Sequence, residues 1–261
     1  MCFPPGARPP EIPADLAPIS GGAGGEDVVL TSSDGAKFRT FLATAKGDAG
    51  VVIAPDVRGL HRFYEELAER FASAGVHAIA VDYFGRTAGT ERPPEDFAFQ
   101  EHVTAARARP DLIQADIGAG AAELRKRTGA TRIFVLGFCM GGRVAFNASA
   151  AQDGLAGVIG FYGVVRKRDE NDKDAPLDRV AKLKAPTLGL FGGADKGIPT
   201  DSVEEFDRAL TDRKLAHHLV TYPGAPHSFF DRSFAEYKKE CDDAWRRALG
   251  FIATGDPKAV K

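Results

Sequence analysis

The chain of 261 residues is 44% hydrophobic and 27% charged, which is typical of a globular protein rather than a disordered or membrane-embedded one. Its formal net charge of -2 gives no electrostatic reason to expect nucleic acid or an anionic membrane as a partner. Three scattered cysteines without a Cys-x-x-Cys pair argue against a disulfide framework and fit a reducing compartment.

Residues 1–25 are rich in Pro, Gly and Ala and show no hydrophobic periodicity, so we expect an N-terminal arm or a disordered tail. They lack the charged opening and the apolar run of a secretion signal. No later segment approaches the roughly 20 apolar residues of a membrane span. We therefore expect a cytoplasmic protein in which residues 26–261 form one domain.

From residue 26 onward the pattern predicts an α/β fold. Two alternating runs in residues 26–42 flank Ser33-Asp34-Gly35, which is a hairpin signal. Short apolar runs then have the length of buried strands, at residues 51–54, 77–81, 133–136, 158–161 and 187–191, with a weaker sixth at 215–222. Helical patterns lie between or after them, at residues 61–74, 110–127, 141–151, 202–210 and 234–252. This alternation predicts a mostly parallel sheet with helices on both faces.

Ligands of such sheets bind beyond the carboxyl ends of the strands, so residues that directly follow each strand are candidates. Cys139 lies in Gly137-Phe138-Cys139-Met140-Gly141-Gly142, between a predicted strand and a predicted helix. A Gly-x-nucleophile-x-Gly turn projects its central side chain into the site, and a helix N-terminus stabilises a thiolate. The alternatives are a buried structural cysteine or a phosphate-binding loop. The dinucleotide fingerprint fails because its second glycine would fall on Cys139.

A cysteine nucleophile needs a base and a group that orients the base. His227 lies in the loop after the last predicted strand, whereas His217 and His218 fall inside that strand. Asp195 follows the predicted strand at residues 187–191, where a turn aspartate is the alternative. The order Cys, Asp, His matches that of the α/β-hydrolase triad. The remaining histidines are expected to be surface or packing residues.

These motifs resemble the dienelactone hydrolase family of α/β-hydrolases, whose nucleophile is a cysteine. The resemblance rests on Gly137-Phe138-Cys139-Met140-Gly141-Gly142, Gly192-Gly193-Ala194-Asp195 and Ala225-Pro226-His227-Ser228-Phe229, and it covers most of the chain. It implies the α/β-hydrolase fold and a Cys139-His227-Asp195 triad.

The resemblance also implies an oxyanion hole from the backbone N–H groups of Val57 and Met140. Asp56 matches a family glutamate that holds the resting cysteine, with a helix cap or surface turn as the alternative for this shorter side chain.

Arginines bind the substrate carboxylate in this family. Arg86 matches the first of them, and a solvated surface arginine is its alternative. The second position is Asp231 here, with Arg232 one residue later, so a carboxylated dienelactone is not a secure expectation.

We therefore expect hydrolysis of a small ester or lactone through an acyl-enzyme, without a metal or another cofactor. A general carboxylesterase or thioesterase with the same triad is one alternative. A non-catalytic α/β-hydrolase fold that binds a ligand or a partner protein is another. The expected partner is a small-molecule substrate, and the protein is expected to be a monomer or a small homo-oligomer.

Overall fold

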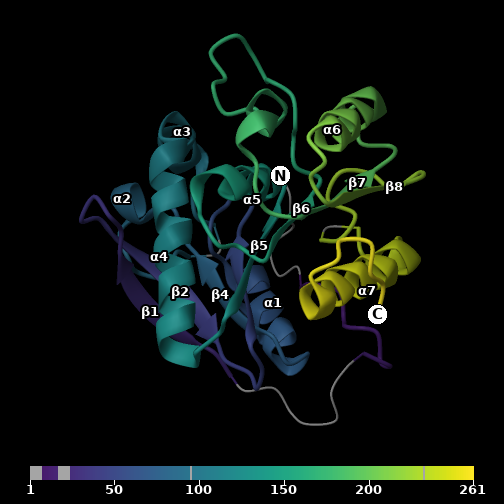
Figure 1. Cartoon of the computed structure of the whole chain (residues 1–261). Coiled ribbons are helices and arrows are strands. Elements are labelled where there is room, and N and C mark those ends of the chain that lie inside the picture. The colour runs from purple at the N-terminus through teal and green to yellow at the C-terminus, as the bar shows by residue number, and fades with distance from the viewer. Residues whose placement is uncertain (1–7, 17–23, 95, 232) are drawn as a thin grey trace.

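The structure is a computed structural model of the chain, and it describes residues 8–16, 24–94, 96–231 and 233–261. An eight-stranded sheet runs through the centre of the molecule, with helices packed against it (Figure 1). The strands are β1 (Glu26–Thr31), β2 (Lys37–Ala43), β3 (Ala49–Ala54), β4 (His77–Val81), β5 (Arg132–Phe138), β6 (Gly157–Phe161), β7 (Thr187–Gly192) and β8 (His217–Tyr222).

The order of strands across the sheet is β1-β2-β4-β3-β5-β6-β7-β8. β2 is antiparallel to both of its neighbours, whereas all pairs from β4 to β8 are parallel. The carboxyl ends of β3 to β8 therefore meet at one edge. We call the residues that directly follow these six strands the strand-end edge, and it is the side on which a ligand is expected.

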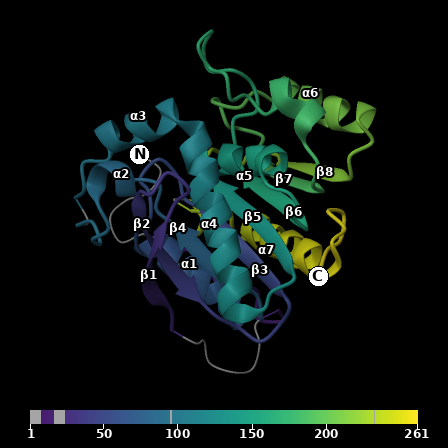
Figure 2. The same ribbon diagram turned by 60° about the vertical axis from the view of Figure 1, so that its left-hand side comes forward.

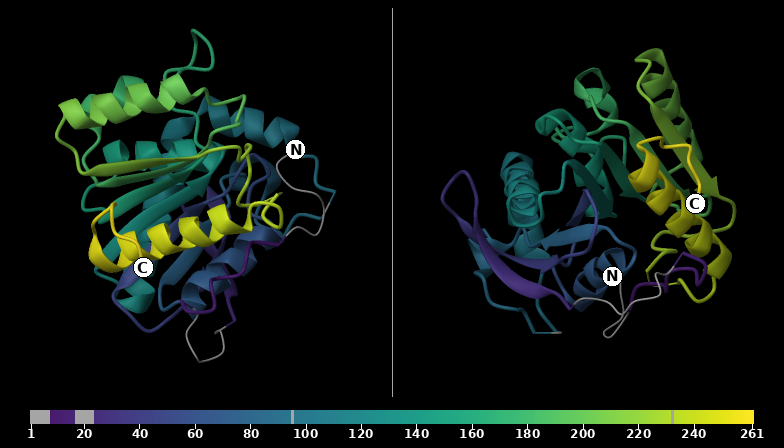
Figure 3. Two further views of the ribbon diagram at one scale, coloured as in Figure 1. Left: turned by 90° about the vertical axis from the view of Figure 1, so that its right-hand side faces the viewer. Right: turned by 60° about the horizontal axis from the view of Figure 1, so that its bottom comes forward.

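Helices cover both faces of the sheet. They are α1 (Arg62–Ser73), α2 (Gly85–Ala88), α3 (Gln100–Ala108), α4 (Pro110–Thr128), α5 (Met140–Ala151), α6 (Thr200–Asp212) and α7 (Lys238–Thr254), and a 3₁₀ helix spans Leu177–Lys182. α1 and α7 share one face, where the rings of Phe71 and Trp245 lie 5.0 Å apart, and α4, α5 and α6 cover the other (Figures 2 and 3). The prediction of a mostly parallel sheet between two helical layers is confirmed.

Burial explains why most strands could be predicted from apolar runs in the sequence. Every residue of β3, β4, β6 and β7 is buried, as expected for parallel strands covered on both faces. β1, at the edge of the sheet, has no fully buried residue, and its pattern alternates between exposed and partly buried. The predicted runs therefore correspond to strands that the helical layers enclose.

The structure differs from the prediction in short helices that were not predicted, among them the 3₁₀ helix at Leu177–Lys182, and in the residues at which several elements begin. α2 and α3 were not predicted, because α2 buries none of its residues and α3 buries only Val103, so neither has an apolar stripe. The last helix begins at Lys238 instead of residue 234, and β8 begins at His217 instead of residue 215.

The described part of the N-terminal arm, residues 8–16, lies across α1 and α7. The indole N–H of Trp245 and the guanidinium of Arg70 both donate to the Pro10 carbonyl, each at 3.1 Å. Arg246 adds an ion pair with Asp15 at 2.7 Å. Within the described ranges, no helix is long and apolar enough to cross a lipid bilayer.

Candidate active site

Cys139 lies at the turn between β5 and α5, on the strand-end edge. Its backbone has φ 55° and ψ -111°, a conformation that L-residues rarely adopt, and its side chain is partly exposed. The Cys139 N–H donates to the Phe161 carbonyl of β6 at 3.0 Å, and the Cys139 carbonyl accepts from Arg143 of α5 at 3.2 Å. The turn is therefore held from both sides in a strained geometry.

Glycines make this turn possible because backbone segments approach each other closely. A Cβ at Gly141 would collide with the carbonyls of Ala54 and Pro55, and a Cβ at Gly142 would collide with the carbonyl of Phe161. The first turn of α5 therefore packs directly on the ends of β3 and β6. This contact brings the nucleophile beside the segment that follows β3.

Asp195 and His227 form a short hydrogen bond on the same edge. His227 Nδ1 lies 2.6 Å from Asp195 Oδ2, and Asp195 Oδ1 accepts from the Gly197 N–H at 2.8 Å. The loops after β7 and β8 are joined by a backbone hydrogen bond from Ala194 to Ala225 at 2.9 Å. The Asp195 side chain is buried, whereas that of His227 is partly exposed. The buried carboxylate therefore fixes one ring nitrogen of an imidazole that solvent can reach.

Tyr162, directly after β6, connects the two halves of the site. Its ring centroid lies 5.0 Å from that of His227 and 6.1 Å from that of Phe138, the residue before Cys139. The cysteine turn and the histidine loop thus lie on either side of one tyrosine, in agreement with the sheet order β5-β6-β7-β8.

The two predicted oxyanion donors lie on adjoining segments. Met140 is the first residue of α5, and Val57 follows β3, against whose end Gly141 packs. Among the residues that the structure describes, no oxygen accepts a hydrogen bond from the N–H group of Val57 or Met140.

Asp56 is fully buried and opens the turn of residues 56–59, in which the Gly59 N–H donates to the Asp56 carbonyl at 3.2 Å. Its Oδ1 accepts from the Arg58 N–H at 2.9 Å, whereas no described group hydrogen-bonds to its Oδ2. Tyr83 lies beside it, with its hydroxyl 2.7 Å from the Asp56 carbonyl. Burial raises the pKa of Tyr83, and the nearby charges of Asp56 and Cys139 raise it further. The Asp56 carboxylate and the Cys139 side chain are therefore both close enough to Tyr83 to affect the pKa of its hydroxyl.

Arg86 lies in α2 and is held by two carboxylates. Its Nε and Nη2 donate to Asp34 at 2.8 and 3.0 Å, and its Nη1 and Nη2 donate to Asp116 at 2.7 and 2.9 Å. These hydrogen bonds raise the pKa of the Arg86 guanidinium, and those of Asp116 are the larger cause. Arg232, the other arginine expected to bind substrate, lies outside the described residues.

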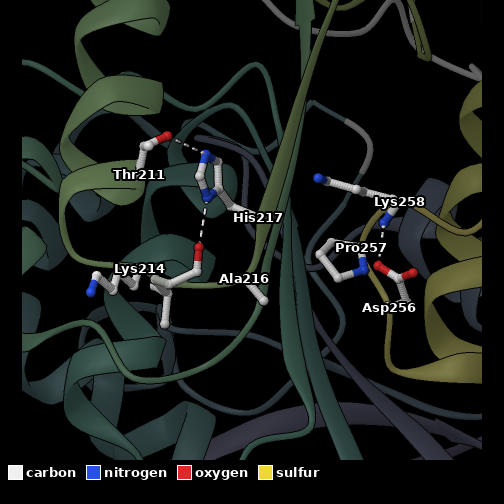
Figure 4. A pocket seen from close by; sticks show the side chains of 8 residues that line it. Thr211, Lys214, Ala216, His217, Asp256, Pro257 and Lys258 are labelled. Atoms are coloured by element: carbon white, nitrogen blue, oxygen red, sulfur yellow. Dashed lines mark hydrogen bonds between the residues drawn. The ribbon is translucent and has the colours of Figure 1, made fainter.

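The two histidines of β8 lie far along that strand from His227. His217 begins β8 and lines a cavity of about 480 Å³ with Thr211 and Lys258 (Figure 4). Its Nδ1 lies 2.7 Å from the Leu215 carbonyl. Burial and the charge of Arg247 lower the pKa of the neighbouring His218. This cavity is at the amino end of the strand, opposite the strand-end edge.

Three residues of the site were not singled out from the sequence. Tyr83, Tyr162 and Ser228 lie next to Asp56, Cys139 and His227, and two of them, Tyr162 and Ser228, have positive φ values of 37° and 62°. The rule of inspecting the residue after each strand would have found Tyr162, which directly follows β6.

Comparisons with known proteins place the chain in one family. The model of the "Dienelactone hydrolase family" matches residues 38–255. A Salmonella typhimurium protein named "Putative carboxymethylenebutenolidase" is 29% identical over 242 residues, which cover 89% of this chain and 88% of that protein. A Bradyrhizobium protein named "Probable 2-oxo-3-(5-oxofuran-2-ylidene)propanoate lactonase" is 28% identical over 77% of this chain and 82% of its own length.

Solved structures show the same fold. The crystal structure titled "Putative Dienelactone Hydrolase" from Klebsiella pneumoniae superposes with a TM-score of 0.76 at 26% identity, and the match covers 88% of this chain and 98% of that one. The predicted α/β-hydrolase fold is confirmed.

Proposed function

Because this chain belongs to the dienelactone hydrolase family and is a hydrolase, we propose that it cleaves small esters or lactones with Cys139 as its nucleophile. The observation that carries the proposal is the 2.6 Å hydrogen bond between Asp195 and His227, on the same sheet edge as a cysteine in a strained turn. A fold that only bound a ligand would need no oriented base beside such a thiol.

In the proposed first step, the Cys139 thiolate attacks the carbonyl carbon of the substrate. A C–S bond forms, and the N–H groups of Val57 and Met140 bind the oxyanion of the tetrahedral intermediate. The C–O bond to the leaving group then breaks, and the imidazolium of His227 gives that oxygen a proton. In a lactone, the leaving alcohol remains attached to the acyl group.

In the second step, neutral His227 takes a proton from water, which attacks the thioester carbonyl. The C–S bond breaks, the carboxylic acid leaves and Cys139 returns as a thiolate. Asp195 holds Nδ1 of the ring, so Nε2 is the nitrogen that exchanges protons with water and the leaving group. Between turnovers the imidazolium of His227 returns its proton to Cys139, and Asp56, whose Oδ2 accepts no hydrogen bond from a described residue, is proposed to hold the resulting thiol.

The geometry around Arg86 supports a neutral substrate over a carboxylated one. Asp34 and Asp116 already use four of its five N–H groups, so a substrate carboxylate could bind in bidentate fashion only by displacing one of them. Parallel assays of a neutral and a carboxylated lactone with Arg86→Ala test this. We expect both activities to change by the same factor. A selective loss of more than about tenfold on the carboxylated lactone would assign carboxylate binding to Arg86.

Steady-state hydrolysis of a p-nitrophenyl ester and of a simple lactone tests the nucleophile. We expect Cys139→Ala to lower kcat/KM by roughly 10⁴-fold or more, because the remaining groups cannot form the acyl-enzyme. Cys241→Ala is the matched control, since Cys241 is buried in α7. Rapid quenching and mass spectrometry should find the acyl group on the peptide that contains Cys139. Unimpaired hydrolysis by Cys139→Ala would remove this residue from the mechanism.

A further inference from the structure

Tyr162 occupies an unusual backbone position on the strand-end edge. It directly follows β6, and its φ of 37° places it among the four described non-glycine residues with positive φ. Its N–H donates to the Leu190 carbonyl of β7 at 2.8 Å, which extends the sheet pairing by one residue. Such a conformation is unfavourable for a residue with a side chain and persists where surrounding contacts enforce it.

The ring of Tyr162 packs against the imidazole of the base. The two centroids are 5.0 Å apart and the planes meet at 58°, while Phe229 contacts Tyr162 from another side at 5.6 Å. Asp195 holds one edge of the His227 ring through Nδ1. An aromatic ring against the face of the imidazole restricts its rotation about that bonded nitrogen.

The hydroxyl of Tyr162 is anchored to the loop that carries His227. It donates to Asp231 Oδ2 at 2.8 Å, and the Asp231 side chain is 1% exposed. The Asp231 N–H in turn donates to the Ser228 carbonyl at 3.2 Å, and Ser228 has a φ of 62°. A buried carboxylate strongly favours a good donor, so this hydrogen bond couples the loop after β6 to the loop after β8.

We propose that Tyr162, anchored by Asp231, is a positioning residue that holds the His227 imidazole in the orientation required for proton transfer. This inference rests on the proposed function, because it assumes that His227 is the base. Asp195 fixes the ring at its Nδ1 edge, and Tyr162 fixes its face. Misplacement of a catalytic group by about 1 Å can cost up to roughly 100-fold in rate.

Tyr162→Phe tests the proposal, because it removes the anchor and keeps the ring. Tyr222→Phe is the matched control: Tyr222, at the end of β8, also donates to a carboxylate, Asp243 Oδ2, at 2.7 Å and also contacts Phe229. We expect Tyr162→Phe to lower kcat about tenfold with KM changed by less than about twofold. Tyr222→Phe should leave kcat within about twofold. Thermal unfolding of both variants shows whether they lose similar stability.

A thermodynamic cycle isolates the anchor. Asp231→Leu should lower kcat about as much as Tyr162→Phe, and the double variant should lose no more than either single variant, because both changes remove the same hydrogen bond. Additive losses would mean that the two side chains act independently, which contradicts the proposal.

Two further results would overturn it: a kcat for Tyr162→Phe no lower than that of Tyr222→Phe, or a rise in KM with kcat unchanged. The latter would make Tyr162 a substrate contact instead.

Failure of the positioning proposal is distinguishable from failure of the proposed function. If Cys139→Ala is inactive and Tyr162→Phe is fully active, only the positioning role falls. If Cys139→Ala remains active, the nucleophile assignment itself is wrong.

Discussion

The two cysteines in the described part of the chain occupy opposite surroundings. Cys139 is partly exposed, begins a helix and has a strained backbone. Cys241 lies within α7, is 1% exposed and donates from Sγ to the Phe229 carbonyl at 3.4 Å. Burial raises the pKa of the Cys241 thiol, and the neighbouring charges of Asp242 and Glu240 raise it further. The surroundings therefore favour a reactive thiol at Cys139 and an unreactive, packed thiol at Cys241.

The difference extends to the regions as wholes. Three of the four described non-glycine residues with positive φ, Cys139, Tyr162 and Ser228, lie at or just beyond the strand-end edge. α7 packs a regular apolar stripe, including Trp245 and Phe251, and ends at Gly255 in the left-handed conformation that commonly terminates helices. Backbone strain is concentrated where the proposed reacting groups lie, and α7 and the strands supply the packing that stabilises it.

The largest expected difference between the two regions is the loss of kcat when a carboxylate in each is replaced by an amide. Asp195→Asn should lower kcat by roughly 10³- to 10⁴-fold, because an amide presents the wrong partner to His227 Nδ1. Asp243→Asn, in α7, changes a carboxylate that accepts from Tyr222 at a similar distance and should alter kcat by less than about twofold. Steady-state kinetics on one activated ester compares the two. Equal losses would show that the strand-end edge has no special role.

The reactivity of the two thiols should differ next most. Iodoacetamide should alkylate Cys139 at least roughly 100-fold faster than Cys241 in the native protein at neutral pH, because Cys241 is buried and its thiol pKa is raised. Peptide mapping over time measures both rates. In denaturant the two rates should converge, and a difference that persisted there would not come from the fold.

Asp82 tests whether the strand-end edge carries an electrostatic cost. It follows β4, is buried, and burial raises its pKa from 3.8 to about 6. The folded state therefore binds this proton more tightly than the unfolded state, so the stability contribution of Asp82 is present below about pH 4 and is lost as the pH rises to about 6. The loss corresponds to roughly 2 to 3 kcal/mol.

Urea unfolding of wild type and Asp82→Asn between pH 4 and 8 measures this term, since other groups titrate equally in both proteins. The free energy of unfolding of wild type, relative to the variant, should fall across that window and then level off. A difference in the free energy of unfolding that is independent of pH, or that rises with pH, would contradict a raised pKa for Asp82.

The smallest expected effect is on packing in α7. Cys241→Ala should lower the free energy of unfolding by about 1 to 2 kcal/mol, through the small cavity and the lost contact with the Phe229 carbonyl. The ester hydrolysis rate should stay within about twofold of wild type. A folded variant with a large loss of activity would show that α7 contributes to the site as directly as the turn at Cys139 does.

Much of this protein could be predicted from local sequence patterns. Fully buried strands such as β3 and β7 appear as continuous apolar runs, and the glycines around Cys139 identify a tight strand–helix turn. Strand order along the chain then placed Asp195 and His227 after neighbouring strands, where the structure joins them by a hydrogen bond. The exposed helices α2 and α3 escaped prediction because they bury almost nothing.

The sequence by itself determined the strands of the sheet, the turn at Cys139 and the chain order of Cys139, Asp195 and His227, because these depend on periodicity and on residues that are close along the chain. Only the tertiary structure decided the partners of the charged groups. Arg86 meets Asp34 and Asp116, and Tyr162 meets Asp231, across separations of 30 to 69 residues. Such pairs leave no local pattern, since any surface arginine or aspartate looks the same until the fold brings its partner within hydrogen-bonding distance.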